Sequence, residues 1–170
     1  MIFKSKVHSS DLYNTLLNLS RNIYFYKNLN FNDSFETRVH LMLFHFSLMM
    51  IIFKKKGKKF SQSSYDSFFN SIEYNLRELG FGDVSVNQKM KNLNKVLYDI
   101  LLKIEKTNNN NFDIDEKTVF KYFQELQNQK GDKFHDFIKY LIKFYNFCFE
   151  LPLDNMIREA INFKNNYGSS

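Results

Sequence analysis

VHLMLFHFSLMMIIF, the stretch from Val39 to Phe53, is the most hydrophobic part of the chain and decides how the remainder must fold. It holds 15 residues, contains His40 and His45, and is preceded by Glu36 and Arg38. A helix that spans a membrane needs about 20 apolar residues. We therefore expect a helix at the centre of a folded core here, with a transmembrane helix as the alternative.

Both ends of this helix are marked in the sequence. Asp33 with Glu36 three residues later is typical of a capping box. In this motif the side chain of each residue accepts a hydrogen bond from the backbone amide of the other. The run KKKGKK, Lys54 to Lys59, closes the helix after Phe53. Lysines suit a helix C-terminus because they face the negative end of its dipole.

On both sides of this helix, apolar residues recur at helical spacing, and no stretch shows the sustained alternation of apolar and polar residues that is typical of a strand. The sequence therefore predicts an all-α fold, a single compact multi-helix domain of about seven helices over residues 1–170. Gly80 is expected to cap the third helix, and Gly82 with Asp83 to form a tight turn into the fourth. The helices are expected at Ser10 to Lys27, Asp33 to Phe53, Ser63 to Leu79, Ser85 to the polar run beginning at Asn108, Asp115 to Gln129, Asp132 to Phe149 and Pro152 to Lys164.

The composition excludes several classes of protein. The formal charge is +6, and the lysines of the KKKGKK run supply five of it, so the rest is close to neutral. Cys148 is the one cysteine, which rules out a disulfide framework and favours a reducing compartment. The N-terminus lacks the apolar core and cleavage site of a secretory signal. Lysine far outnumbers arginine, so each of the four arginines marks a position where a planar guanidinium is hard to replace.

Two patterns are candidates for binding. Arg38 and His45 are seven residues apart and project from nearly the same side of a helix, so they could line one edge of a groove. Their ordinary interpretation is an ion pair and a core histidine. On the third helix, Asp66, Glu73 and Arg77 share a polar stripe, which is either a solvated face or a means to hold the turn at Gly80 or a partner.

The sequence offers little that resembles a catalytic or metal-binding motif. The four histidines form neither HExxH nor a Cys/His pairing, and GxSxG and the phosphate loop are absent. We therefore expect no enzyme, no catalytic residue, no metal and no cofactor.

An ordered series of short motifs resembles the ubiquinol-cytochrome c chaperone family, and LRELGFGD, Leu76 to Asp83, is its clearest member. The resemblance covers about residues 12–105 and leaves the C-terminal helices, about residues 112–165, divergent. It departs from the family pattern at Phe44, where a Leu is usual, and at Asp99 and Ile100, where a Gly and an Arg follow the Tyr. Its residues are Leu12, Tyr13, Arg21, Phe25, Tyr26, Asp33, Ser34, Phe35, Glu36, Arg38, His45, Gln62, Asp66, Phe68, Phe69, Ile72, Glu73, Leu76 to Asp83, Val86 and Lys89.

The resemblance implies an assembly chaperone that binds newly made cytochrome b, apo or haem-loaded, and assists its maturation into ubiquinol-cytochrome c reductase. Mitochondrial relatives work with a small helical partner near the ribosomal exit site. The expected location is the cytoplasm, soluble or peripheral to the inner membrane, or the matrix side in a eukaryote. The candidate client contacts are Phe35, Glu36, Arg38, His45, Asp66, Glu73, Arg77, Glu78 and Asp83.

A second hypothesis comes from the lysine run. A basic helical module could dock on a ribosome or on an anionic membrane, because each lysine near an acidic bilayer gains about 1 kcal/mol. No sequence-specific nucleic-acid motif accompanies the lysines. The candidate contacts for this function are Lys54, Lys55, Lys56, Lys58 and Lys59.

Overall fold

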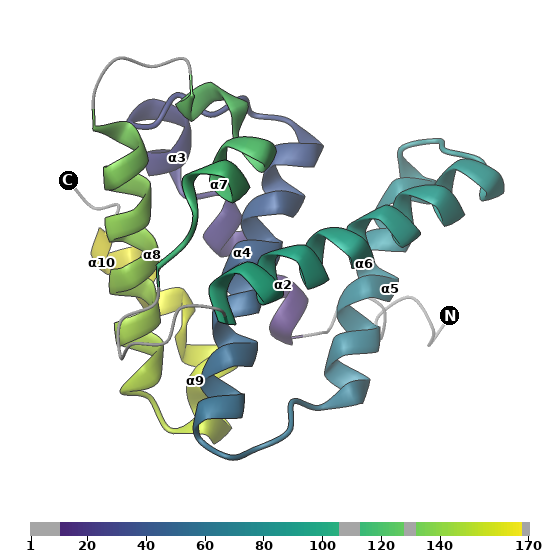
Figure 1. Cartoon of the computed structure of the whole chain (residues 1–170). Coiled ribbons are helices and arrows are strands. Elements are labelled where there is room, and N and C mark those ends of the chain that lie inside the picture. Colours follow the sequence, from purple (N-terminus) through teal and green to yellow (C-terminus); the bar gives the residue numbers. More distant parts are fainter. Residues whose placement is uncertain (1–10, 106–112, 128–131, 168–170) are drawn as a thin grey trace.

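The predicted hydrophobic helix lies at the centre of the molecule. The computed structural model describes residues 11–105, 113–127 and 132–167, and its longest apolar helix is α4 (Phe35–Lys55) (Figure 1). Every residue from 39 to 49 of α4 is buried. A helix that is hydrophobic on all sides must be enclosed by other elements, and this requirement organises the fold.

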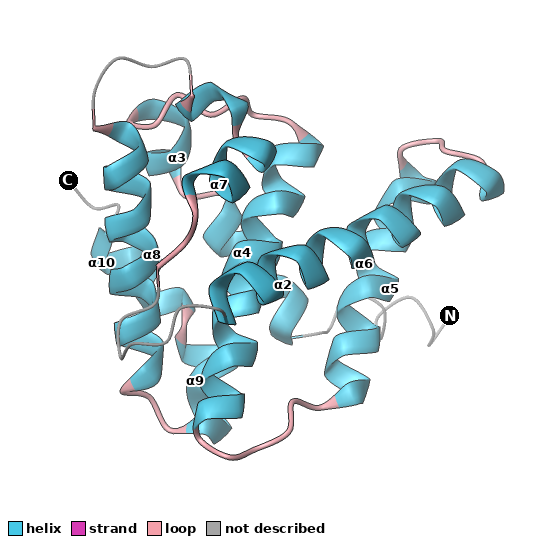
Figure 2. Cartoon of the chain, in the orientation of Figure 1, coloured by secondary structure: helices cyan, strands magenta, loops and turns pink. Residues whose placement is uncertain are grey.

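Helices from both ends of the chain enclose α4. It is contacted by α2 (Asp11–Ser20), α6 (Asp83–Glu105) and α8 (Lys133–Phe149). The two C-terminal helices, α9 (Leu153–Glu159) and α10 (Ile161–Tyr167), pack on α2, and α5 (Gln62–Glu78) packs on α2 and α6. Three short helices complete the order: α3 (Ile23–Lys27), α7 (Glu116–Tyr122) and the 3-10 helix η1 (Gln124–Leu126). Figure 2 shows helices and loops alone throughout the described ranges, which confirms the all-α prediction.

Among the described residues, α4 is the one helix long and apolar enough to cross a membrane. Of its most apolar 18-residue window, 78% is buried inside the fold. The contacts that surround it agree with the expected core helix.

An aromatic cluster joins the two halves of the chain beside α4. Phe31, in the loop after α3, stacks on Phe123 with ring centroids 4.7 Å apart. Phe25 meets Tyr140 of α8 edge to face at 4.8 Å. Aromatic pairs in these geometries add about 0.5–1.5 kcal/mol to the burial of their surfaces. The cluster therefore fixes the N-terminal segment and α8 against the same side of α4.

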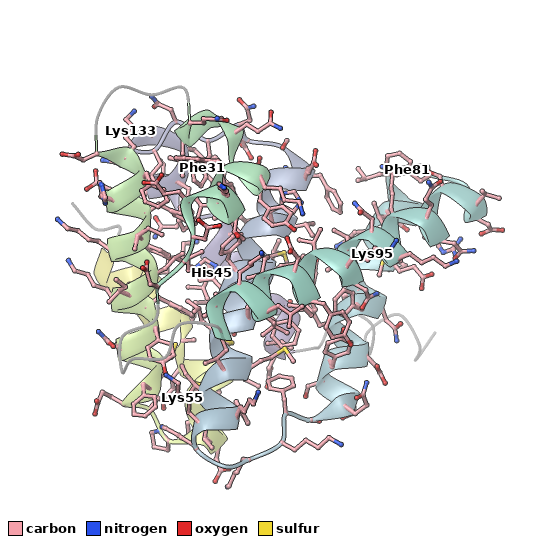
Figure 3. All side chains as sticks on the ribbon, in the orientation of Figure 1. Phe31, His45, Lys55, Phe81, Lys95 and Lys133 are labelled. Atoms are coloured by element: carbon pink, nitrogen blue, oxygen red, sulfur yellow. The ribbon has the colours of Figure 1, made fainter. Side chains whose placement is uncertain are left out.

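His45 belongs to this core. It has 0% exposed surface; its Nδ1–H donates to the Leu41 carbonyl at 2.6 Å, and its Nε2 accepts from the Tyr140 hydroxyl at 2.8 Å. Figure 3 shows it between the helices. Burial lowers the pKa of His45 to about 4. The histidine is therefore a neutral, hydrogen-bonded link between α4 and α8.

The structure corrects the predicted helix starts. The cap of α4 is Ser34, whose hydroxyl accepts from the Thr37 amide at 3.2 Å, while Asp33 pairs with Arg38 at 3.5 Å. Ser85 was expected to begin the fourth helix, but it lies inside α6, which begins at Asp83. At α4 the residue next to the predicted cap, Ser34, is the one that satisfies an exposed amide.

Some predicted helices are divided. The first ends at Ser20, because the Asn22 side chain accepts from the Tyr24 amide and starts α3 as a new helix. The fifth ends at Tyr122 and continues as η1, and the last is interrupted at Ala160 between α9 and α10. The predicted polar loop at residues 108–111, the helix end at Gln129 and the break at Gly131 lie outside the described residues.

The buried imidazole of His45 predicts how stability depends on pH. The folded pKa of about 4 lies below the ordinary value of 6.5, so the unfolded chain binds the proton more readily in that window. The contribution is fully present above pH 6.5 and is lost as pH falls toward 4, by about 3 kcal/mol in the free energy of unfolding. Urea unfolding across this window should show the loss in the wild type.

His45→Gln keeps hydrogen-bonding groups but does not titrate, so its stability should fall less steeply over the same window. His135→Gln, at an exposed histidine, is the matched control and should follow the wild type. The same pH dependence in wild type and His45→Gln would contradict a neutral imidazole in the core.

Candidate functional site

The linked ends of α5 and α6 form an arm, residues 70–90, that projects from the other helices (Figure 1). The reversal between the helices is a Schellman motif. The Phe81 amide donates to the Leu76 carbonyl at 3.2 Å and the Gly80 amide to the Arg77 carbonyl at 3.0 Å, with Gly80 at φ 93°. Only glycine adopts this φ readily, so the predicted cap at Gly80 is confirmed.

Arg77 ties the two helices together at the reversal. Its guanidinium donates to Asp83, the first residue of α6, and to Glu73 one turn back at 3.4 Å. The hydrogen bond to Asp83 raises the pKa of Arg77. Because the group is exposed, the ion pairs direct the chain more than they stabilise it. Of the roles left open for Arg77, the structure shows one: it holds the turn.

The end of the arm exposes apolar side chains. Leu79, Phe81 and Val84 have 60%, 40% and 83% of their surface exposed. The Phe81 ring lies 4.7 Å from the Lys89 ammonium, which holds the ring toward α6. Exposed apolar side chains that cluster, rather than scatter, mark a surface that contacts another molecule.

An apolar groove runs between this arm and the N-terminal half of α4. It consists of two adjoining hollows of about 500 and 450 Å³, which share Phe35, Val39 and Leu79. The first hollow is also lined by Leu76, Phe81, Lys89 and Leu93. The second is also lined by Leu17, Met42, Ile72, Asn75 and Glu78. Hollows of this size, apolar inside with a few polar groups, are typical of binding sites.

Charged side chains of both signs line the groove. Glu36 and Lys89 border the first hollow, and Arg21, Arg38 and Glu78 border the second. The Arg38 Nε also donates to the Ser34 carbonyl at 3.4 Å. The groove therefore offers a partner an apolar centre with hydrogen-bonding groups along its sides.

A third hollow of about 400 Å³ adjoins the groove at Ser34, Glu36 and His40. His40 is 8% exposed, and burial lowers its pKa. Its Nδ1 has no hydrogen-bond partner among the described residues. This hollow is more polar than the groove, because Lys121 and Glu125 face it.

The structure brings part of the predicted client set together. Phe35, Glu36, Arg38 and Glu78 line the groove, and Glu73, Arg77 and Asp83 form the corner of the arm beside it. Asp66 lies about 16 Å along α5 from Arg77, by the rise of 1.5 Å per residue, and is bonded to Gln62. His45 does not line the groove with Arg38 as expected, because it has no exposed surface from which to touch a client.

The five lysines of the basic run, Lys54 to Lys59, make different contacts. Lys56 donates to the carbonyls of Phe149 at 2.5 Å and Leu151 at 3.0 Å, so it caps the end of α8. Lys55 lies over the Tyr145 ring at 5.4 Å. Lys54, Lys58 and Lys59 are also exposed, and Lys54 takes part in a further interaction.

Sequence reasoning placed Phe35 among the client contacts but missed Val39, Leu79 and Phe81 of the groove. Leu79 follows Leu76 at helical spacing, as a core residue would, and Phe81 lies between the expected cap at Gly80 and the expected turn at Gly82. Val39 was assigned wholly to the core. One signal was present: a large aromatic residue between two glycines, where a polar residue is the rule for an exposed turn.

A family model described as Ubiquinol-cytochrome C chaperone matches residues 27–115, just over half of the chain. The chain belongs to this chaperone family. The match takes in all of α4, α5 and α6, and so includes the arm and most of the groove. No curated protein and no solved structure matches the chain.

Membership in the ubiquinol-cytochrome c chaperone family gives the chain a role in the assembly of ubiquinol-cytochrome c reductase, also called complex III, with a protein as its client. Within the described residues, no cluster of three or more His, Cys, Asp or Glu could hold a metal ion. The groove is lined by apolar side chains that a protein client could cover, so it is the candidate site for this role.

Two leucines one turn apart test the assignment of the groove. Leu76 is 2% exposed and Leu79 is 60% exposed. Leu76→Ala should lower the free energy of unfolding by about 2–5 kcal/mol, as core leucines do. Leu79→Ala should lower it by less than about 1 kcal/mol, because its side chain contributes little to the fold. Chemical denaturation measures both, and equal losses would place Leu79 in the core.

Proposed function

We propose that the chain binds newly made cytochrome b in the groove and holds it until it enters ubiquinol-cytochrome c reductase. The observation that carries this proposal is the exposed apolar end of the arm, Leu79, Phe81 and Val84, beside a groove of two apolar hollows. The family supplies complex III as the destination.

The chemistry of the groove suits an apolar helical segment. An amphipathic or apolar helix docks by placing side chains three and four residues apart into successive hollows. The two hollows share Phe35, Val39 and Leu79, so they form one continuous site for such a row of side chains. Cytochrome b is an integral membrane protein, so its helices are apolar before insertion. Met42 adds an adaptable side chain to the floor of the groove.

The proposed action is binding without catalysis, and it uses no cofactor. The single thiol of the chain, Cys148, is buried in α8, and burial raises its pKa to about 12. A thiol with this pKa stays protonated and unreactive at neutral pH. We place this action in the cytoplasm, in solution or at the surface of the inner membrane, or on the matrix side in a eukaryote.

The alternative function, docking on a ribosome or an anionic membrane, has weaker support as the main role. Two of its five predicted lysines, Lys55 and Lys56, contact α8 instead of standing free. The exposed lysines could still serve the chaperone by bringing it to a surface where cytochrome b is made.

Photocrosslinking in cells tests the client directly. A photoreactive residue at Leu79 should crosslink to cytochrome b, because this side chain is exposed and faces the groove. The matched control is the same residue at Asn146, which is exposed on α8 away from the groove. Products identified by mass spectrometry that lack cytochrome b at position 79, or contain it equally at position 146, would contradict the proposal.

A second experiment tests whether the groove is needed for maturation. Deletion of the gene should lower b-type haem in reduced-minus-oxidised spectra, and the wild-type gene should restore it. Leu79→Glu combined with Phe81→Ser should fail to restore it, since a charge and a hydroxyl replace apolar contacts at exposed positions. Lys139→Glu, an exposed change on α8, should restore it. Normal haem levels after deletion would refute the function itself.

A further inference from the structure

A polar hollow lies beside the groove, between α4 and the segment formed by α7 and η1. It is the third hollow, of about 400 Å³, and its ionisable lining includes Glu36 and His40 of α4, Lys121 of α7 and Glu125 of η1. Glu36 and His40 are four residues apart on α4 and so share one face. They also line the first hollow of the groove. A partner that fills the groove therefore reaches the polar hollow as well.

His40 brings an unsatisfied acceptor to the polar hollow. The residue is 8% exposed, and burial lowers its pKa, so the ring is uncharged at neutral pH. The Tyr122 carbonyl accepts a hydrogen bond from the ring, while Nδ1 has no partner among the described residues. The donor is therefore Nε2–H, and the lone pair of Nδ1 is left over. A buried polar atom in this state costs free energy until a donor reaches it.

The carboxylates of the polar hollow are not paired with a cation. Within the described ranges, Glu36 and Glu125 form no ion pair. The Asn32 amide donates to Oε1 of Glu125 at 3.2 Å and holds that carboxylate in place. Lys121 donates to the Asp99 carboxylate at 3.1 Å, which balances its charge. The free groups of the polar hollow are therefore acceptors, and its charge is negative.

Two cations that line the neighbouring groove have partners of their own. Arg38 pairs with Asp33 at 3.5 Å, and the Lys89 ammonium lies over the Phe81 ring at 4.7 Å. Neither forms an ion pair with Glu36 in the described part of the chain. The negative charge of the polar hollow is therefore available to a partner.

The acceptors of the polar hollow favour a guanidinium group. Among the described residues no three His, Cys, Asp or Glu side chains could hold a metal ion, and this includes Glu36, His40 and Glu125. A cation that meets all three must therefore be a larger, branched group. A guanidinium carries five N–H donors in a planar fork, bonds carboxylates in pairs and is more weakly hydrated than an ammonium. It can satisfy the carboxylates and the Nδ1 lone pair together.

We propose that the polar hollow binds an arginine of the client, at the end of the apolar helix that docks in the groove. Apolar helices of membrane proteins are flanked by lysine and arginine on the cytoplasmic side, so such a segment is common in a client of this kind. The helix covers Phe35 and Val39, and its flanking arginine lies against Glu36 and His40. This inference rests on the groove as the client site, and it adds the feature by which a client segment is selected.

Peptides of the client test the requirement for arginine. Overlapping peptides that cover the cytochrome b of the same cell are screened on an array with the purified full chain. Those that bind are then titrated in solution by fluorescence anisotropy, and they should join an apolar stretch to an arginine. Replacing this arginine by Gln should weaken binding on the order of tenfold. Replacing it by Lys should weaken binding less, because the charge remains but the planar fork is lost.

A mutant cycle assigns the arginine to the polar hollow. The variant with both Glu36→Gln and Glu125→Gln should bind the arginine peptide about tenfold more weakly than the wild type does. It should no longer distinguish that peptide from its Gln form. The control, Glu116→Gln with Glu150→Gln, removes the same charge at exposed positions outside both sites and should keep the preference. Circular dichroism checks that both variants fold.

The outcomes separate this inference from the proposed function. Peptides that bind equally with arginine and with Gln would overturn the inference and leave the groove as the client site. An equal loss of affinity in the two double variants would also overturn it, because net charge would then explain the effect. Equal binding of the Lys peptide would overturn the choice of arginine. If no peptide of cytochrome b binds, the proposed function falls and this inference falls with it.

Discussion

The burial of α4 on every side is the constraint from which the other features of the molecule follow. A run of residues from 39 to 49 without an exposed member needs neighbours all round, and these come from both ends of the chain: α2, α6 and α8. The hydrogen bond between His45 and Tyr140 fixes the place of α8, and the aromatic cluster around Phe25 and Phe31 fixes the N-terminal segment. The helix is long and apolar enough to enter a membrane, yet it serves as the core of a bundle.

The groove exists because the enclosure of α4 is incomplete near its N-terminus. The Schellman motif with Arg77 joins α5 to α6, and their linked ends project outward as the arm. Phe35 and Val39 of α4 are then faced by Leu79 and Phe81 across two hollows, not by tightly packed neighbours. A chaperone for a membrane protein needs such a surface, since its client presents apolar helices that water would drive to aggregate.

Local features of the sequence predicted much of this structure. The apolar run predicted the core helix, Gly80 predicted the cap, and the pair Glu73–Arg77 predicted an ion pair that the structure extends to Asp83. Features that depend on distant contacts were beyond local patterns. Spacing cannot separate Leu76, which is buried, from Leu79, which is exposed three residues later. Likewise, nothing near Lys56 in the sequence indicates that it reaches the carbonyls at the end of α8.

Hydrogen exchange of the purified chain, with and without cytochrome b held in detergent, would show where the client binds. We expect slower exchange of amides in residues 34–42 and 76–93, and no change in α9. Protection confined to α7–α10, or none at all, would contradict the groove as the client site.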